Sequence, residues 1–482
     1  MVARSGPLKH SGMDNGWNRR SAFSCGGKRS SVEAGQNLSS QRRTGGSVKK
    51  LGELLAANRR GKAQGVHSVC SANRFVLEAG MLQALRDGNL LLIESTSNQV
   101  NQFGGYTGQT PTEFAEFVGG IAKAMGLAKE RIVLGGDHLG PHVWRKEPSS
   151  SAMEKAKEMV GAYVRAGFKK IHLDASMPCA DDQVGPNQSL PDEIVSERAA
   201  ELCKAAEQAH KSAPSSKSAP LYVIGTEVPI PGGEVLGSKA PEVTSTRDLA
   251  HTLEVAKQAF RSHGLNSAWD RVIAVVVQPG VEFGDTSVFP YDSKKAKRLA
   301  HFRARVWSGV YEAHSTDYQT RLALRQMVVD HFAILKVGPW LTFALREAVF
   351  ALAAMEKELL SEKSGVTLSG LPEVLDKAMV DDPVHWKSYY SGDEGALRIA
   401  RKYSYSDRIR YYWPQPAVST ALQQLLHNLT EYPVPESMLD QYLPGQAEAV
   451  RTGEIAVQPA VLIRHKILEV LDQYAYACGF QQ

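Results

Sequence analysis

Eight short apolar runs recur along this chain, and seven of them break into ionisable or amide side chains at their C-terminal ends. Amphipathic segments of helical length separate the runs, with no hairpin turns between them. Strands that alternate with helices run parallel and are covered on both faces, and eight such units close most naturally into a barrel. The runs are 65–71, 89–95, 131–138, 169–176, 221–229, 271–280, 305–314 and 331–339. The pattern predicts an α/β fold, a (β/α)8 TIM barrel.

The chain is longer than such a barrel requires. It has 482 residues, whereas a barrel typically takes about 250. The apolar runs stop after a predicted eighth helix at 342–361, and the remainder shows helical periodicity with a Trp and Tyr cluster at 403–413. The first 48 residues are rich in Ser, Gly and Arg and poor in large apolar side chains. We therefore predict a disordered basic leader at 1–48, the barrel at 49–361 and a mainly helical C-terminal domain at 362–482.

The net charge of +5 belongs to the N-terminal segment. Residues 1–50 carry +8, and the remaining residues carry −3, so nucleic-acid binding by the folded part is not expected. The Arg-rich, acid-poor leader also resembles an organelle transit peptide. No apolar run reaches the roughly 18 residues of a membrane span. The five cysteines are scattered without paired spacing, at Cys25, Cys70, Cys179, Cys203 and Cys478. A reduced, cytoplasmic protein is the expected default.

The polar residues at the strand ends predict one site. The carboxyl ends of the strands meet on one face of a barrel, where barrel enzymes place their chemistry. Ionisable groups are costly to bury without partners, so their recurrence at these positions indicates a functional role and not a chance occurrence. The residues are Glu94, Asp137, His138, His172, Asp174, Glu227, Gln278, Glu312, His314 and Lys336.

Several long motifs resemble the GatZ/KbaZ family of tagatose-phosphate-metabolising proteins. They read IESTSNQVNQFGGYTG at 93–108, LGGDHLGP at 134–141, YEAHSTDYQT at 311–320 and SDRIRYYWP at 406–414, with shorter matches at 171–176, 224–229 and 336–339. The resemblance runs from about residue 50 to the C-terminus. It implies one of two roles. Some members are accessory subunits of tagatose-1,6-bisphosphate aldolase, and others are stand-alone epimerases that invert C4 of a ketohexose or its 6-phosphate.

The chemistry of C4 inversion limits the possible mechanisms. The C4 hydrogen of a 2-ketose lies beta to the carbonyl and is not acidic, so simple deprotonation would face a very high barrier. Retro-aldol cleavage of the C3–C4 bond, rotation of the aldehyde fragment and re-addition would invert C4 without redox chemistry. No Gly-x-Gly-x-x-Gly fingerprint follows a strand to support oxidation at C4, and no Gly-x-x-x-x-Gly-Lys-Ser/Thr loop supports a kinase. We predict D-tagatose 6-phosphate 4-epimerisation to D-fructose 6-phosphate, with the accessory aldolase subunit as the alternative.

A retro-aldol site needs a base and a divalent metal ion. By analogy with the Asp-His step of metal-dependent aldolases, we assign proton transfer to Asp137 and a metal bond to His138. The further ligand candidates are Glu227 and His314, a set that does not distinguish Zn, Mn, Co or Ni. The remaining catalytic candidates are Glu94 and Asp174, as a second acid/base or hydroxyl binders, and Lys336, as an enolate stabiliser or Schiff-base former. His172 is either a ligand or a barrel-core histidine.

A phosphorylated ketohexose also needs groups that bind its hydroxyls and phosphate. The 98–108 loop, with Asn98, Gln99 and Gln102, is expected to cover the substrate. Gly338, at the start of the eighth helix, and Ser315 are expected to bind phosphate. Arg408 and Arg410 would clamp the phosphate from the C-terminal domain, or else pair structurally between domains. An aldolase catalytic subunit is the expected partner in the alternative role, and a homo-oligomer stays open.

Overall fold

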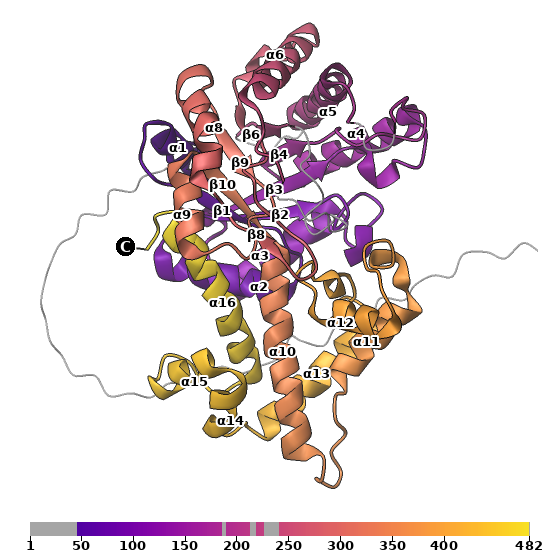
Figure 1. Ribbon diagram of the computed structural model, residues 1–482, viewed down its shortest axis with the longest axis vertical. Coiled ribbons are helices and arrows are strands. Elements are labelled where there is room, and N and C mark those ends of the chain that lie inside the picture. The colour runs from indigo at the N-terminus through magenta and orange to yellow at the C-terminus, as the bar shows by residue number, and fades with distance from the viewer. Residues whose placement is uncertain (1–45, 186–188, 213–217, 226–240, 482) are drawn as a thin grey trace, which may run out of the picture. The chain divides into compact units, whose positions relative to one another are not determined.

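The computed structural model describes residues 46–185, 189–212, 218–225 and 241–481, apart from the side chains of 304–306. Within them, eight parallel strands close into a barrel in the order β1-β10-β9-β6-β5-β4-β3-β2 (Figure 1). The strands are β1 (Val66–Val69), β2 (Leu91–Thr96), β3 (Ile132–Leu139), β4 (Lys170–Leu173), β5 (Leu221–Ile224), β6 (Val272–Val276), β9 (Val310–Ala313) and β10 (Phe332–Val337). Each coincides with one of the eight predicted runs, with β2 and β3 ending one residue beyond theirs, so the predicted TIM barrel is confirmed.

A helix follows each strand and covers the outside of the barrel. These helices are α2 (Arg74–Asp87), α3 (Pro111–Met125), α4 (Ser149–Arg165), α5 (Asp192–Ser212), α6 (Thr246–Ser262), α8 (Ser293–Val306), α9 (Arg321–Val329) and α10 (Pro339–Leu360). The sequence at α3 shows why the boundaries fall where they do. Thr110 and Glu113 form a reciprocal capping box, Pro111 takes the first helical position, and Gly126 ends the helix at φ 76°.

Further elements occur within the barrel sequence. A short antiparallel pair, β7 (Glu282–Phe283) and β8 (Val288–Phe289), follows β6, and the one-turn helix α7 (Asn266–Trp269) precedes it. Helix α1 (Ser47–Arg59) enters the barrel sequence, and its Leu51 and Leu55 pack with side chains from β1, β2, β3, β5, β6, β9 and β10. The predicted leader up to residue 45 lies outside the described residues.

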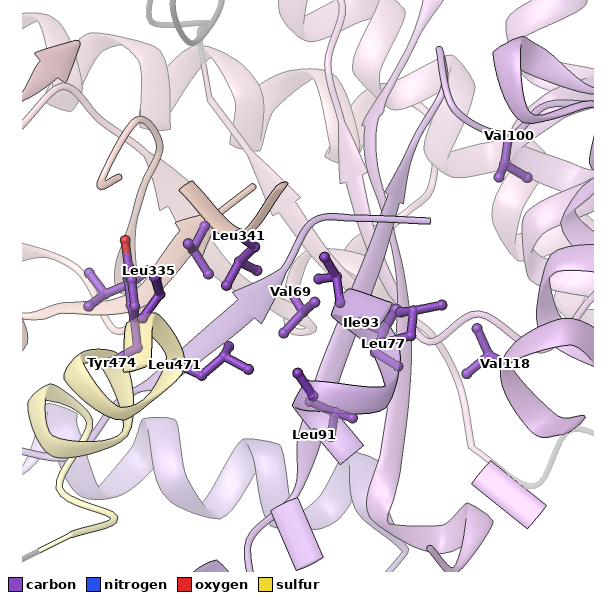
Figure 2. Close-up of a cluster of buried hydrophobic side chains, with 14 of the residues drawn as sticks. Val69, Leu77, Leu91, Ile93, Val100, Val118, Leu335, Leu341, Leu471 and Tyr474 are labelled. Atoms are coloured by element: carbon purple, nitrogen blue, oxygen red, sulfur yellow. The ribbon is translucent and has the colours of Figure 1, made fainter. Parts of the chain in front are cut away.

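The larger apolar core lies between the strands and the surrounding helices. Figure 2 shows Val69 and Ile93 from the barrel beside Leu77 of α2, and Leu335 beside Leu341 of α10. All five side chains are fully buried. At roughly 25 cal/mol per Å² of apolar surface, burial of this layer is the main force that holds the helices against the barrel.

The predicted C-terminal helical extension is also confirmed. It comprises α11 (Leu371–Asp381), α12 (Glu394–Tyr403), α13 (Pro416–Glu431), α14 (Glu436–Tyr442), α15 (Pro444–Arg451) and α16 (Pro459–Ala477), with the 3-10 turns η4 (Pro383–His385) and η5 (Arg408–Tyr411). Helix α16 returns to the barrel and packs against α2, α9 and α10. The predicted boundary at residue 362 stays a prediction. None of the described helices is long and apolar enough to cross a membrane.

Candidate active site

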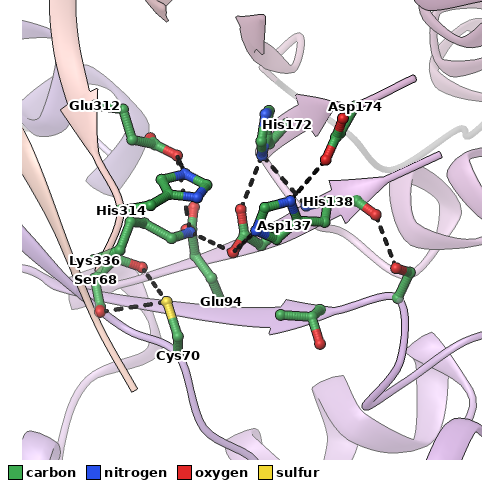
Figure 3. Close-up of polar contacts among 12 residues, drawn as sticks. Ser68, Cys70, Glu94, Asp137, His138, His172, Asp174, Glu312, His314 and Lys336 are labelled. Carbon is green, nitrogen blue, oxygen red and sulfur yellow. Dashed lines mark hydrogen bonds and ion pairs between the residues drawn. The ribbon is translucent and has the colours of Figure 1, made fainter. Parts of the chain in front are cut away.

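The structure brings the strand-end side chains together at the C-terminal end of the barrel (Figure 3). Asp137 and His138 come from β3, His172 from β4, and Lys336 from β10. Glu94 of β2, Asp174 directly after β4, Glu312 of β9 and His314 directly after β9 complete the set. All eight are buried except His138, which is partly exposed. The convergence follows from the parallel order of the strands.

Three imidazoles lie in contact at the centre, and each has a carboxylate partner. The ring centroid of His138 lies 5.1 Å from that of His172 and 4.8 Å from that of His314. The Nδ1 atom of His138 lies 2.7 Å from Asp174 Oδ2. The Nδ1 atom of His172 lies 3.0 Å from Asp137 Oδ1. Nε2 of His314 lies 3.2 Å from Glu312 Oε1. Carboxylates paired in this way orient metal-binding imidazoles in many proteins.

Two buried lysines lie among the carboxylates. Lys170 has no exposed surface and forms ion pairs with Glu94 and, at 2.7 Å, with Glu312 Oε2. Lys336 contacts Glu94 and lies 2.9 Å from Asp137 Oδ2. The ammonium groups thereby compensate charges that would be costly to bury alone.

The electrostatics of the cluster favour ionised carboxylates and a neutral His314. Burial opposes ionisation of Asp137 and Asp174, but the imidazoles, His138 foremost, outweigh it and hold the pKa of both below the ordinary value. Burial also opposes ionisation of Glu312, yet Lys170 and His314 lower its pKa to about 2. Burial lowers the pKa of His314, which favours the neutral imidazole that binds metals.

Backbone strain marks the same place. His138 has a φ of 48° and Ser315 has a φ of 52°, both in the left-handed region that residues other than glycine rarely adopt. Such conformations cost on the order of 1–3 kcal/mol and persist where surrounding contacts impose them, often at functional sites.

The residues present fit a divalent metal ion. Ligand atoms of Asp137, His172, Glu312 and His314 all lie within 4.8 Å of one another. The Nε2 atom of His172 is buried without a hydrogen-bond partner among the described residues, which leaves one ligand atom unused. With neutral imidazoles, the four carboxylates and two ammonium groups of this cluster sum to a charge of −2, which matches a divalent cation.

A second group, Cys70, Glu94 and Asp137, also has the spacing of metal ligands. The ammonium of Lys336 contacts both carboxylates of this group and lies close enough to the Cys70 thiol to interact with it. The first group fits a metal ion better, because it offers two imidazoles and the second group offers none.

A cavity of about 120 Å³ opens above the cluster. The predicted residues that line it are Asn98, Gln99, Asp137, His138, His314, Ser315, Lys336, Gly338 and Arg410. Glu94 and Asp174 lie behind this lining and contact it through Lys336 and His138.

Gln102 and Arg408 also lie outside the described lining. Gln102 donates a hydrogen bond to the carbonyl of Lys155 instead. Arg408 stacks on Tyr389 and donates to the carbonyl of His385, contacts that lie inside the C-terminal extension and not between it and the barrel. Glu227 lies outside the described residues, so its predicted metal bond stays a prediction.

The predicted phosphate donors already have partners. The backbone N–H groups of Gly338 and Trp340, at the start of α10, both donate to Asp317 Oδ1, at 3.0 and 2.8 Å. The Ser315 hydroxyl donates to Glu282 Oε2. Phosphate binding by Gly338 and Ser315 would require these groups to exchange partners, because a carboxylate already accepts from the first turn of the helix.

The sequence profile of a family described as D-tagatose-1,6-bisphosphate aldolase subunit GatZ/KbaZ-like matches residues 51–479. The chain belongs to the GatZ/KbaZ-like family. The resemblance predicted from the motifs is thus confirmed.

The crystal structure of a probable tagatose 6 phosphate kinase from Sinorhizobium meliloti 1021 is similar over 86% of this chain and 100% of that one, with 44% identity and a TM-score of 0.78. The fructose-bisphosphate aldolase from Campylobacter jejuni is 12% identical over 80% of this chain and 92% of that one, with a TM-score of 0.42. So distant a likeness carries no argument about function.

Sequence reasoning missed several side chains at the site of this GatZ/KbaZ-like protein. Lys170 had a usable signal, because Lys170, His172 and Asp174 alternate on one strand and therefore share a face. Other lining residues that were not predicted individually include Cys70, Thr96, Tyr106, His142, Asp317 and Tyr411, of which Tyr106 lies in the loop predicted to cover the substrate. Apart from Thr96, which ends β2, they lie in loops or short 3-10 turns without a periodic pattern that would assign them to the site.

Proposed function

We propose that this protein epimerises D-tagatose 6-phosphate at C4 to give D-fructose 6-phosphate, by metal-dependent retro-aldol and aldol steps. The single observation that carries the proposal is the set of three mutually contacting imidazoles, each paired with a carboxylate, beside a cavity lined by Asp137. Membership of an aldolase-related family supports it.

Asp137 is the proposed acid/base. Its carboxylate takes the proton of the C4 hydroxyl, the C3–C4 bond breaks, and the electron pair passes to the C1–C3 fragment as an enediolate. Glyceraldehyde 3-phosphate forms from C4 to C6. After this aldehyde rotates, C3 attacks its other face and Asp137 returns the proton to the new C4 oxygen. The cavity must retain both fragments between the two steps, since release would make the protein an aldolase.

His138 and His314 are the proposed metal ligands, and we include His172, which the sequence left open as a ligand or a barrel-core histidine, because its Nε2 atom has no hydrogen-bond partner among the described residues. His172 and His314 belong to the group with metal-ligand spacing, whereas the assignment of His138 rests on the Asp-His analogy. A bound divalent ion would polarise the C2 carbonyl and stabilise the negative charge of the enediolate. Asp174 orients His138 through the 2.7 Å contact with Nδ1. We therefore assign Asp174 as a positioning residue.

Lys336 is proposed to supply positive charge next to Asp137. Its ammonium lies 2.9 Å from Asp137 Oδ2 and contacts Glu94. Burial lowers the pKa of Lys336 to about 8, so the ammonium still predominates at neutral pH, whereas a Schiff base requires the neutral amine. Glu94 holds Lys336 in place and does not line the cavity, so its proposed role is positioning.

The alternative is an accessory subunit of tagatose-1,6-bisphosphate aldolase with little activity of its own. The description of the matching family favours this role. A subunit that acts only through contacts would have no physical need for a buried cluster of four carboxylates, two lysines and three histidines.

Activity of the purified protein alone distinguishes the two roles. The protein is incubated with tagatose 6-phosphate, with chelator or with added divalent metal, and fructose 6-phosphate is followed by a coupled enzyme assay. We expect metal-dependent conversion that Asp137→Asn abolishes. Absence of conversion with every metal tested would refute the epimerase and favour the accessory role.

A further inference from the structure

A second cavity, of about 260 Å³, adjoins the candidate active site. The two cavities share Cys70, Gln99, Tyr106 and Arg410 in their walls. The second one extends from these residues to the N-terminal end of α2 and to Trp413, which follows η5. A molecule bound over the imidazole cluster therefore has one neighbouring space into which its far end can extend.

The second cavity is electropositive. Arg74 and Arg410 line it, and no Asp or Glu is among its described lining residues. Arg74 donates to Glu78 at 2.8 Å, and Glu78 also accepts from Arg464 at 2.8 Å. One carboxylate outside the lining thus contacts two guanidinium groups. The N-terminal end of α2 adds a further positive potential.

A buried donor without an acceptor borders the same space. Trp413 is only 7% exposed, and its indole Nε1–H has no hydrogen-bond partner among the described residues. Leaving such a group unsatisfied is unfavourable, so native proteins usually pair it with protein, water or ligand. An oxygen-rich anion in the cavity would supply the missing acceptor.

We propose that this second cavity binds the terminal phosphate of a ketohexose phosphate whose C2–C4 region lies over the imidazole cluster. The proposal rests on the proposed function for the position of the sugar. It assigns phosphate recognition to Arg74, Arg410 and Trp413 rather than to the first turn of α10, whose N–H groups donate to Asp317. Arginine suits this role because its planar donor fork matches phosphate oxygens.

The test measures binding, which does not depend on turnover. Dissociation constants for fructose 6-phosphate, fructose and inorganic phosphate are measured by titration calorimetry on the full-length, metal-supplemented protein. The variants are Arg74→Gln and Trp413→Phe, which remove one guanidinium and one N–H group. Arg464→Gln is the matched control, because Arg464 is the other guanidinium that contacts Glu78 but does not line the cavity.

We expect fructose 6-phosphate to bind the wild type at least tenfold more tightly than fructose. Arg74→Gln and Trp413→Phe should each weaken fructose 6-phosphate binding, and Arg74→Gln, which removes a charge, should do so by roughly tenfold or more. Neither variant should change fructose binding, and Arg464→Gln should bind both sugars as the wild type does. Equal binding of the two sugars by the wild type, or unchanged fructose 6-phosphate binding in both variants, would overturn the proposal. Inorganic phosphate that binds as tightly as fructose 6-phosphate would overturn its assignment to a sugar phosphate. Variant-sensitive binding without turnover of tagatose 6-phosphate would support the phosphate site and refute only the epimerase.

Discussion

Replacement of Lys170 by methionine is the sharpest test of how the site is built. Lys170 has no exposed surface, and its ammonium contacts both Glu94 and Glu312. Methionine is similar in length to the lysine stem but carries no charge. The Lys170→Met variant therefore leaves the packing largely intact and removes the cation between two buried carboxylates.

The expected loss follows from the burial of this pair. Removing one partner of a buried ion pair typically costs about 3–5 kcal/mol. The pKa of Glu312 gives a second measure of how strongly its charge is stabilised. Burial alone would raise this pKa, but Lys170, foremost among the opposing causes, helps to lower it from 4.5 to about 2. A carboxyl group shifted that far on folding stabilises the fold by roughly 3 kcal/mol at neutral pH. We expect Lys170→Met to lower the free energy of unfolding by about 3 kcal/mol or more.

Denaturant unfolding at pH 7.5, followed by tryptophan fluorescence and circular dichroism, measures this loss. Lys377→Met is the matched control, because Lys377 pairs with Asp381 across one turn of α11 with both side chains mostly exposed. Such surface pairs contribute about 0.5 kcal/mol or less. The double variant Lys170→Met/Glu312→Gln should recover part of the loss, since it removes one of the two buried carboxylates that Lys170→Met leaves without this cation.

The sign of the pH dependence adds a second check. The folded-state pKa of Glu312 is depressed, so its stabilising contribution is present above pH 4.5 and is lost as the pH falls toward 2. In Lys170→Met the depression is removed and Glu312 takes up a proton more readily in the folded state. The deficit of the variant should therefore be smaller at pH 4 than at pH 7.5. A loss no larger than that of Lys377→Met, or one independent of pH, would refute the charge-compensation argument.

Three further predictions concern the site itself. His138→Ala and His314→Ala should each reduce bound metal at least tenfold by elemental analysis with an unchanged circular dichroism spectrum, and undiminished metal would remove that residue from the ligand set. Asp137→Asn should keep the metal, since the three proposed imidazole ligands remain, but lower kcat roughly 10²–10⁴-fold, and normal turnover would show that the base lies elsewhere. Burial raises the pKa of Asp317 to about 6, so this group destabilises the fold as the pH rises from 3.8 through 6. The Asp317→Asn variant should gain stability relative to wild type at pH 8 but not at pH 4, as measured by unfolding at both values.

The barrel could be predicted from sequence because its signal is repeated and local. Each strand is an apolar run of four to eight residues, and the fold follows from their number and order. The same regularity placed Glu94, Asp137, His172 and Lys336 at one end of the barrel. Their mutual contacts could not be predicted, since the pairing of Lys170 with Glu94 and Glu312 depends on strands that are distant in sequence.

The loop residues were harder to assign for a different physical reason. Arg408 and Arg410 are two residues apart in one 3-10 turn, yet only Arg410 lines the cavity, while Arg408 stacks on Tyr389. Asn98 and Gln102 share one loop, and only Asn98 lines the cavity. In irregular backbone no fixed period relates sequence position to direction, so residue type alone does not separate a ligand-facing side chain from a structural one.

The C-terminal extension forms part of the candidate site and is not merely attached to the barrel. Arg410 and Tyr411 line the cavity over the imidazole cluster. The Tyr411 ring packs edge-on against Tyr106 of the 98–108 loop, with ring centroids 4.8 Å apart. The ion pair of Asp407 with Arg346 of α10, buried at 2.9 Å, fixes η5 to the barrel's last helix. Because one wall of the cavity depends on these contacts, the extension supplies groups that would enclose a substrate and exclude water from the proposed enediolate.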